Sequence, residues 1–165
     1  MGFVEGFGQP MIQAFLEDAG LHYLRDLEGD FVVEFGYDDE LAGHPRFLLA
    51  ASGDDRSQFC LRGDVLKRVP RADWDRQIRL CNEWNALYKL PKVYLEVEDF
   101  NISATGRILC EQWLNLGPGI HQELVNHLTN SFFSACFGFW RWRERQDALH
   151  ALGDDLPDPL SDDEG

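Results

Sequence analysis

The histidines are the residues best suited to acid–base or metal chemistry, and they are scattered along the chain: His22, His44, His121, His127 and His150. Residues three or four apart share one face of a helix. The two closest histidines, His121 and His127, are six residues apart and do not meet that spacing. No HExxH zinc motif and no nucleophile-elbow sequence occurs. We therefore predict no catalytic histidine.

The cysteines are also far apart in the chain: Cys60, Cys81, Cys110 and Cys136. Structural zinc sites use closely spaced Cys or His pairs, and no such pair is present. The spacing predicts reduced thiols, most of them buried, and no metal ligand.

Two loops carry residue types that can bind ions. Asp38, Asp39 and Glu40 precede His44, but their spacing is not that of an EF-hand loop, and we expect a solvated loop. The sequence 117–119, Gly-Pro-Gly, lacks the Lys and Ser/Thr of a phosphate-binding loop. The sequence thus predicts a protein that is not an enzyme and has no catalytic, metal-ligating or cofactor-binding residues.

The charge balance disfavours two kinds of partner. The chain has 29 acidic and 15 basic residues, for a formal net charge of −14. Nucleic-acid binding relies on Lys and Arg neutralising phosphates, so we expect no nucleic-acid partner. An anionic membrane surface is disfavoured for the same reason. No charged leader with an apolar core and no apolar run of about 18 residues occurs, and we predict a cytoplasmic protein.

The length of 165 residues corresponds to one domain, which we place at residues 1–150. Residues 151–165 contain acidic residues and two prolines but no Lys or Arg. Such a composition cannot bury enough apolar surface to order a chain. We expect residues 151–165 to form an acidic, disordered tail.

Hydrophobic periodicity predicts helices over residues 10–20, 73–91 and 117–149. Strands are expected over residues 23–27, 31–35, 47–51, 58–62, 93–97 and 102–114. Helical spacing places five residues on one side of the middle helix: Trp74, Ile78, Cys81, Asn85 and Tyr88. Three more residues widen this apolar surface: Leu80, Trp84 and Leu87. The order α-β-β-β-β-α-β-β-α, with short turns between strands, indicates an α+β fold with helices on an antiparallel sheet.

The end of the middle helix has an unusual composition, because Asn82 and Asn85 surround Trp84 where Ala, Leu or Lys would favour a helix. The strand Lys-Val-Tyr-Leu follows at residues 92–95. Together these segments resemble the bacterial YbjN-like family. The sequences at 16–21 (LEDAGL), 28–30 (EGD) and 114–117 (LNLG), with Phe132 and Phe133 in the last helix, are also similar to that family.

The resemblance implies the fold of the type III secretion (Tir) chaperones and a role in sensory transduction. It implies that the protein binds or regulates another protein or a second copy of itself, since chaperones of this fold are typically dimeric. For Asn82, Trp84 and Asn85 two interpretations remain open. Their side chains could recognise a partner, or they could satisfy buried backbone groups at the helix–strand junction. We favour the structural interpretation.

The end of the last helix has the sequence FGFWRWRER at residues 137–145. Its aromatic residues are too closely spaced to face a single core, and Trp and Arg are enriched at binding hot spots. The candidate partner-binding residues are Phe139, Trp140, Arg141, Trp142, Arg143 and Arg145. The alternative, to which we give equal weight, is that Trp142 lies along the domain's own strands and the arginines pair with Glu144, Asp147 or the acidic tail.

The sequence favours a non-enzymatic protein-binding domain with a chaperone-like or regulatory role. Its surface would hold a segment of another protein or of a second copy, for instance by strand addition at a sheet edge. The alternatives are a small-ligand binder, an enzyme of unknown reaction and a structural subunit.

Overall fold

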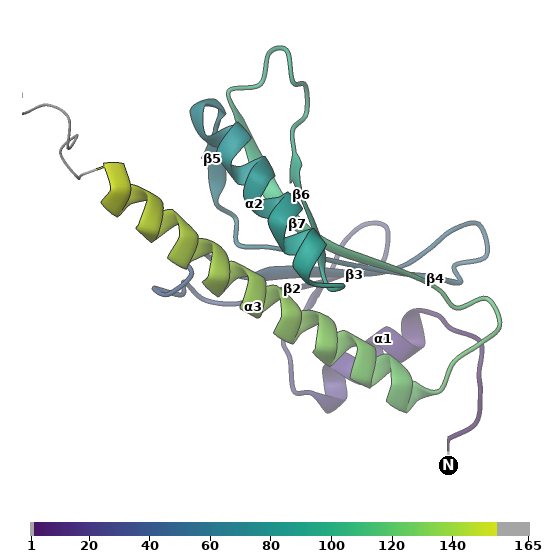
Figure 1. Ribbon diagram of the computed structural model, residues 1–165. Helices are drawn as coiled ribbons and strands as arrows, with labels where there is room; N and C mark the ends of the chain where they lie inside the picture. Colours follow the sequence, from purple (N-terminus) through teal and green to yellow (C-terminus); the bar gives the residue numbers. More distant parts are fainter. Residues whose placement is uncertain (1, 155–165) are drawn as a thin grey trace, which may run out of the picture.

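The computed structural model describes residues 2–154, which form three helices and one seven-stranded antiparallel sheet (Figure 1). The helices are α1 (Gln9–Asp18), α2 (Trp74–Leu87) and α3 (Gln122–Asp154), and a 3₁₀ turn at Arg71–Asp73 leads into α2. The strands are β1 (Leu24–Arg25), β2 (Phe31–Glu34), β3 (Arg46–Ser52), β4 (Gln58–Asp64), β5 (Arg68–Pro70), β6 (Lys92–Glu96) and β7 (Thr105–Asn115).

The predicted α+β class and the order of the elements are confirmed, with the short strand β5 as an addition. β5 has only three residues, too few to show the alternation that identifies a strand. The boundary predicted at residue 150 is too early, because α3 continues to Asp154. Residues 155–165, the rest of the predicted acidic tail, lie outside the described residues.

The strand order is β1-β2-β3-β4-β7-β5, and β6 pairs with the other side of β7. Every pairing is antiparallel. The length of β7 explains this arrangement. Residues 110–115 pair with β4 and residues 105–107 with β5, while residues 107–111 pair with β6 on the opposite side. β6 is therefore an edge strand.

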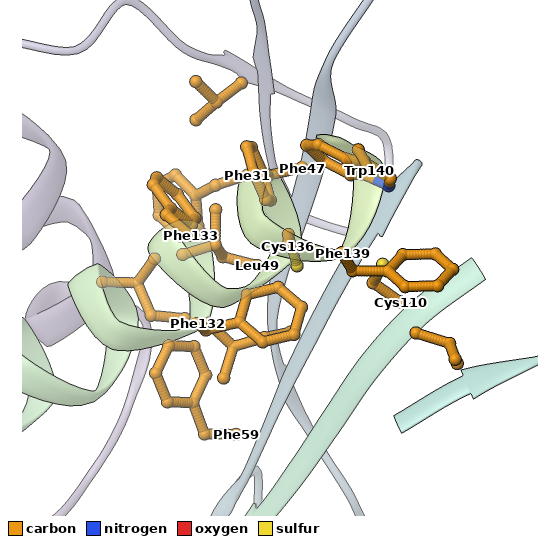
Figure 2. Packing of buried hydrophobic residues seen from close by; sticks show 14 of the residues in the cluster. Phe31, Phe47, Leu49, Phe59, Cys110, Phe132, Phe133, Cys136, Phe139 and Trp140 are labelled. Carbon is orange, nitrogen blue, oxygen red and sulfur yellow. The ribbon is translucent and has the colours of Figure 1, made fainter. Parts of the chain in front are cut away.

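The core lies between one face of the sheet and the helices. Phe47 of β3 is fully buried, and its ring stacks on Phe133 of α3 with a centroid distance of 4.0 Å. Figure 2 shows Trp140 and Cys136 farther along α3, in the same cluster. On this face Phe47 and Leu49 of β3 and Phe59 and Leu61 of β4 are fully buried, so large apolar residues recur at every second position.

The middle helix buries Trp74, Cys81 and Trp84 of the predicted apolar surface, but it is rotated so that Gln77 is buried and Ile78 is not. Trp74, Gln77, Cys81 and Trp84 are buried, whereas Ile78 is 43% exposed. Gln77 is buried because it hydrogen-bonds to Arg143 and Asp147 of α3. A polar contact between two helices therefore sets the rotation of α2.

The opposite face of the sheet carries no helix among residues 2–154 (Figure 1). We call it the open face. In Figure 1, β6 and the first half of β7 rise away from the plane of β2, β3 and β4, so the sheet is strongly bent. Small and apolar residues on this face are still buried: Val32, Ala50, Cys60 and Leu109. Long charged and aromatic side chains on the same face cover them.

Candidate functional site

The sequence predicts a partner-binding surface at the end of α3, and this prediction is wrong for three of its residues. Phe139, Trp140 and Arg143 are buried, with 0%, 1% and 3% of their surface exposed. The physical reason is that this part of α3 packs on two sides at once. Trp140 lies against Phe47 of the sheet, with ring centroids 5.5 Å apart, and Phe139 lies against Trp84 of α2 at 5.2 Å. The chain's own elements therefore cover both groups of aromatic residues.

Trp142 is half-buried and also packs on Trp84, at a centroid distance of 5.5 Å. Of the predicted surface residues, only Arg141 and Arg145 are exposed. Two isolated arginines do not form the aromatic surface that the sequence suggested. Trp142 thus packs on its own domain, as the alternative interpretation expects, but its partner Trp84 belongs to helix α2 and not to a strand.

The alternative interpretation expects the arginines of this helix to pair with Glu144 or Asp147, but these carboxylates have other partners. Glu144 accepts from Lys67 Nζ at 2.7 Å, and Asp147 accepts from Arg76 and from Gln77 Nε2. Arg143 Nε instead donates to Gln77 Oε1 at 2.7 Å. The acidic residues of α3 thus bind Lys67, which directly precedes β5, and Arg76 of α2.

Within the asparagine–tryptophan motif, Asn85 bonds to the backbone of β6. Its side-chain amide donates to the carbonyl oxygen of Val93 at 2.8 Å and accepts from the Val93 N–H at 3.0 Å. Trp84 is 6% exposed and belongs to the core, whereas Asn82 is exposed. Asn85 therefore takes the place of a neighbouring strand at the centre of edge strand β6.

The open face collects charged residues from six strands, β2 to β7. The register places on it the cations Arg46, Arg62, Arg68, Lys92 and Arg107 and the carboxylates Glu34, Asp64, Glu96 and Glu111. This face thus has a small excess of positive charge on a protein with a formal net charge of −14. Two aromatic residues accompany the charges, Tyr94 and the 45% exposed Trp113.

Glu111 occupies the centre of this network and is 4% exposed. Its carboxylate accepts from Arg62 Nε at 2.9 Å, from Lys92 Nζ at 2.6 Å and from Tyr94 Oη at 2.8 Å. Burial alone would raise the pKa of Glu111, but hydrogen bonds from Lys92, Tyr94 and Trp113 outweigh it and lower the pKa to about 2. Glu111 is therefore ionised, and it holds side chains from three strands in place.

A hollow of about 130 Å³ lies beside Glu111 on the open face, lined by Arg46, Leu48, Arg62, Gly63, Asp64, Arg107 and Leu109. Burial raises the pKa of Asp64, and the nearby Arg107 and Arg46 oppose that shift. Arg107 also donates to Glu96 Oε2 at 2.6 Å. The lining of the hollow combines four charged side chains with the apolar Leu48 and Leu109.

Glu111→Gln is expected to remove a pH-dependent part of the stability. The pKa of Glu111 is about 2 in the folded protein against an ordinary value of 4.5, so its contribution is present above pH 5 and lost as the pH falls to 2. We expect the variant to lose about 2 kcal/mol at pH 7, allowing for solvent around the half-exposed Lys92, and much less at pH 3.

Urea unfolding at pH 7, 5 and 3 checks this prediction. Glu98→Gln is the matched control, because Glu98 is exposed and its replacement makes the same change in charge. An equal loss of stability in both variants at pH 7 would contradict a central role for Glu111.

The residue types that the sequence singled out for chemistry form no reactive set. All cysteines are buried and free, as predicted, and burial raises the pKa of Cys60 to about 11 and that of Cys81 to about 12. Thiols with such pKa values are poor nucleophiles at neutral pH. Within residues 2–154, no cluster of three or more His, Cys, Asp or Glu residues could hold a metal ion.

The loop that contains Asp38 is a turn, in which the Asp38 carboxylate accepts from the backbone N–H groups of Glu40 and Leu41.

Across the described part of the chain, no helix combines the length and the apolar character that crossing a membrane requires.

Sequence reasoning missed the open face, although part of the signal was present. Tyr94 and Glu96 alternate with apolar residues in β6, which indicates a polar outer face. Arg46, Arg62 and Arg107 come from three strands, and only the sheet register brings them together.

The fold and the site define a small α+β domain with helices on one face of a bent sheet and a charged, aromatic face on the other. The model of the YbjN family, described as "Putative bacterial sensory transduction regulator", matches residues 10–144. The chain belongs to the YbjN family. No curated protein matches the chain.

One similar solved structure is titled "Crystal structure of YbjN, a putative transcription regulator from E. coli". The likeness has a TM-score of 0.68 at 10% sequence identity, and it covers 88% of this chain and 97% of the E. coli chain. At this identity the likeness shows the fold, which the two proteins share.

Proposed function

We propose that this protein is a non-enzymatic regulatory domain that holds an extended segment of a partner protein on the open face of its sheet. The observation that carries the proposal is the position of Trp113, Tyr94 and the arginines on the face without a helix. Trp, Tyr and Arg are the residues most enriched at binding hot spots. The family's description as a regulator of sensory transduction agrees with such a role.

The structure favours binding on the face over strand addition at the β6 edge. Asn85 already occupies the outward N–H and C=O of Val93, so an added strand could not pair at that residue. On the open face the side chains are held by ion pairs such as that between Arg62 and Glu111. Preformed anchors reduce the entropy that is lost on binding.

The anchor side chains also contact one another. The guanidinium of Arg62 lies 5.9 Å from the Trp113 ring centroid, and Lys92 Nζ lies 5.3 Å from that of Tyr94. A partner side chain that packs on the exposed part of Trp113 would also meet Arg62. A protein of this kind would act in the cytoplasm on a protein partner, or on a second copy of itself, without a cofactor.

The proposal predicts that Trp113→Ala weakens partner binding without unfolding the domain. A hot-spot residue contributes about 2 kcal/mol or more, so we expect a loss of affinity of about 30-fold. The partner is first identified by affinity purification of the wild-type protein, and titration calorimetry with the purified partner then measures the affinity of each variant.

Leu124→Ala is the matched control, because Leu124 is 45% exposed like Trp113 but lies on α3, away from the open face. Equal binding by the Trp113 variant and the wild-type protein would contradict the proposed surface. A strict monomer in light scattering that retains no protein during purification would contradict the proposed function. If the only partner found is a second copy, the open face is a dimer interface.

A further inference from the structure

Asp64 is a buried carboxylate with fewer hydrogen bonds than its two oxygens can accept. It is 6% exposed, and the one hydrogen bond that its carboxylate accepts within residues 2–154 comes from Arg107 Nη1, at 3.4 Å. Glu111, the other buried carboxylate of the open face, accepts from three side chains at 2.6 to 2.9 Å. An ionised carboxylate has about four acceptor positions, and buried polar groups without partners are unfavourable. Asp64 therefore has acceptor positions that remain available to a ligand.

These positions border the hollow of about 130 Å³ on the open face, whose other charged lining residues are Arg46, Arg62 and Arg107. Carboxylates hold Arg62 and Arg107 through hydrogen bonds of 2.9 Å and 2.6 Å. Arg46 makes no hydrogen bond in the described part of the chain, and its Nε lies 3.6 Å from the carboxylate of Glu34. Arg46 and Asp64 are directly opposite each other in the pairing of β3 with β4. The hollow thus offers an available donor beside an available acceptor.

The charges around the hollow discriminate between the groups that could enter it. A cationic side chain would meet three arginines, and an anionic side chain would meet Asp64. A hydroxyl or an amide group avoids both repulsions, because it can donate to Asp64 and accept from Arg46. Its carbon atoms would lie against the apolar part of the lining, Leu48 and Leu109. Water can occupy the same positions, so an entering side chain must reproduce the hydrogen bonds of the water that it displaces.

We propose that the hollow receives a neutral hydroxyl or amide side chain, that of Ser, Thr, Asn or Gln, from the partner segment held on the open face. This role of the hollow rests on the function proposed above and adds the residue type that the partner must carry. Asp64 and Arg46 are then the residues that select the partner's side chain, whereas Trp113 supplies contact area.

The test uses the full chain and fluorescently labelled synthetic peptides that copy the partner segment, which is located in the protein retained by affinity purification. Alanine replaces each peptide residue in turn, and fluorescence anisotropy measures the affinity. We expect one Ser, Thr, Asn or Gln position at which alanine lowers the affinity about tenfold, because a hydrogen bond to a charged group is lost. Lys or Glu at that position should lower the affinity further. Changes in the peptide cannot unfold the protein.

Two variants of the protein connect this peptide position to the hollow. Asp64→Ala should bind the parent peptide and its alanine version with affinities within about twofold of each other, because the shared hydrogen bond is already absent. Arg46→Ala, at a partly exposed residue, should reduce the same difference. Glu96→Ala is the matched control, because Glu96 accepts from Arg107 as Asp64 does but lies outside the hollow. In this variant the tenfold difference should remain.

The proposal is overturned if no hydroxyl or amide position of the peptide loses its effect in Asp64→Ala, or if the position coupled to Asp64 carries a charged or an apolar residue. Trp113→Ala separates this outcome from a failure of the proposed function. If Trp113→Ala weakens binding while Asp64→Ala leaves the peptide preference unchanged, the open face remains the binding surface and the role of the hollow falls. If Trp113→Ala also binds like the wild-type protein, both proposals fall.

Discussion

Trp140→Ala is expected to destabilise the protein by about 4 kcal/mol, because the removal of a fully buried tryptophan leaves a large cavity. The Trp140 ring packs against Phe47 at 5.5 Å and against Phe137 at 5.2 Å, so the cavity would open between the sheet and α3. Urea unfolding followed by circular dichroism measures the change. For a domain of this size such a loss removes a large part of the total stability.

Two further variants make this test specific. Arg141→Ala, at the next residue, is expected to change the stability by less than about 0.5 kcal/mol, because Arg141 is exposed. Trp140→Phe should cost much less than the alanine variant, because the Trp140 indole N–H is buried without a hydrogen-bond partner. A Trp140→Ala protein with wild-type stability would instead place this residue on a surface, where the sequence suggested it.

Asn85→Ala is expected to destabilise the protein by about 3 kcal/mol, because it leaves both the N–H and the C=O of Val93 without their partner. It also uncovers the middle of edge strand β6, and unpaired edges promote association between chains. We therefore expect lower stability in urea, together with concentration-dependent association in light scattering.

Asn82→Ala is the control, since Asn82 carries the same side chain on the same helix, whereas the hydrogen bonds to Val93 come from Asn85. It should behave like the wild-type protein in both measurements. Asn85→Asp is expected to be intermediate, because a carboxylate still accepts from the Val93 N–H but cannot donate to its carbonyl oxygen. If the two alanine variants were equally stable, the contact with Val93 would not hold the edge strand.

The sequence predicts the fold well because its signals are local. Apolar residues alternate along the strands and recur at helical spacing in residues 10–20, because one side of each strand or helix faces the core. Both patterns can be recognised from residues that are close together in the chain. The role of Asn85 could also be anticipated, since it lies at a helix end directly before a strand. These elements require no knowledge of distant contacts.

The end of α3 could not be predicted in the same way. If α3 packed on the sheet alone, Phe139 and Trp142 would be exposed to solvent. In the structure both side chains pack on Trp84 of α2, which covers a second side of α3. The rotation of α2 likewise depends on the contact between Gln77 and Arg143, which are 66 residues apart. The open face also arises from pairing between strands, as when Arg62 meets Glu111 across 49 residues.

The length of α3 has a practical consequence for experiments on this protein. A helix of 33 residues is about 50 Å long, and the part after residue 144, where the family match ends, extends for about 15 Å. This end projects beyond the sheet in Figure 1, and its Leu149 and Leu152 are 61% and 65% exposed. A fluorophore or a sensor surface attached through an engineered cysteine in this last stretch would stand clear of the open face. The protein could then be immobilised in one orientation with its proposed partner-binding side accessible.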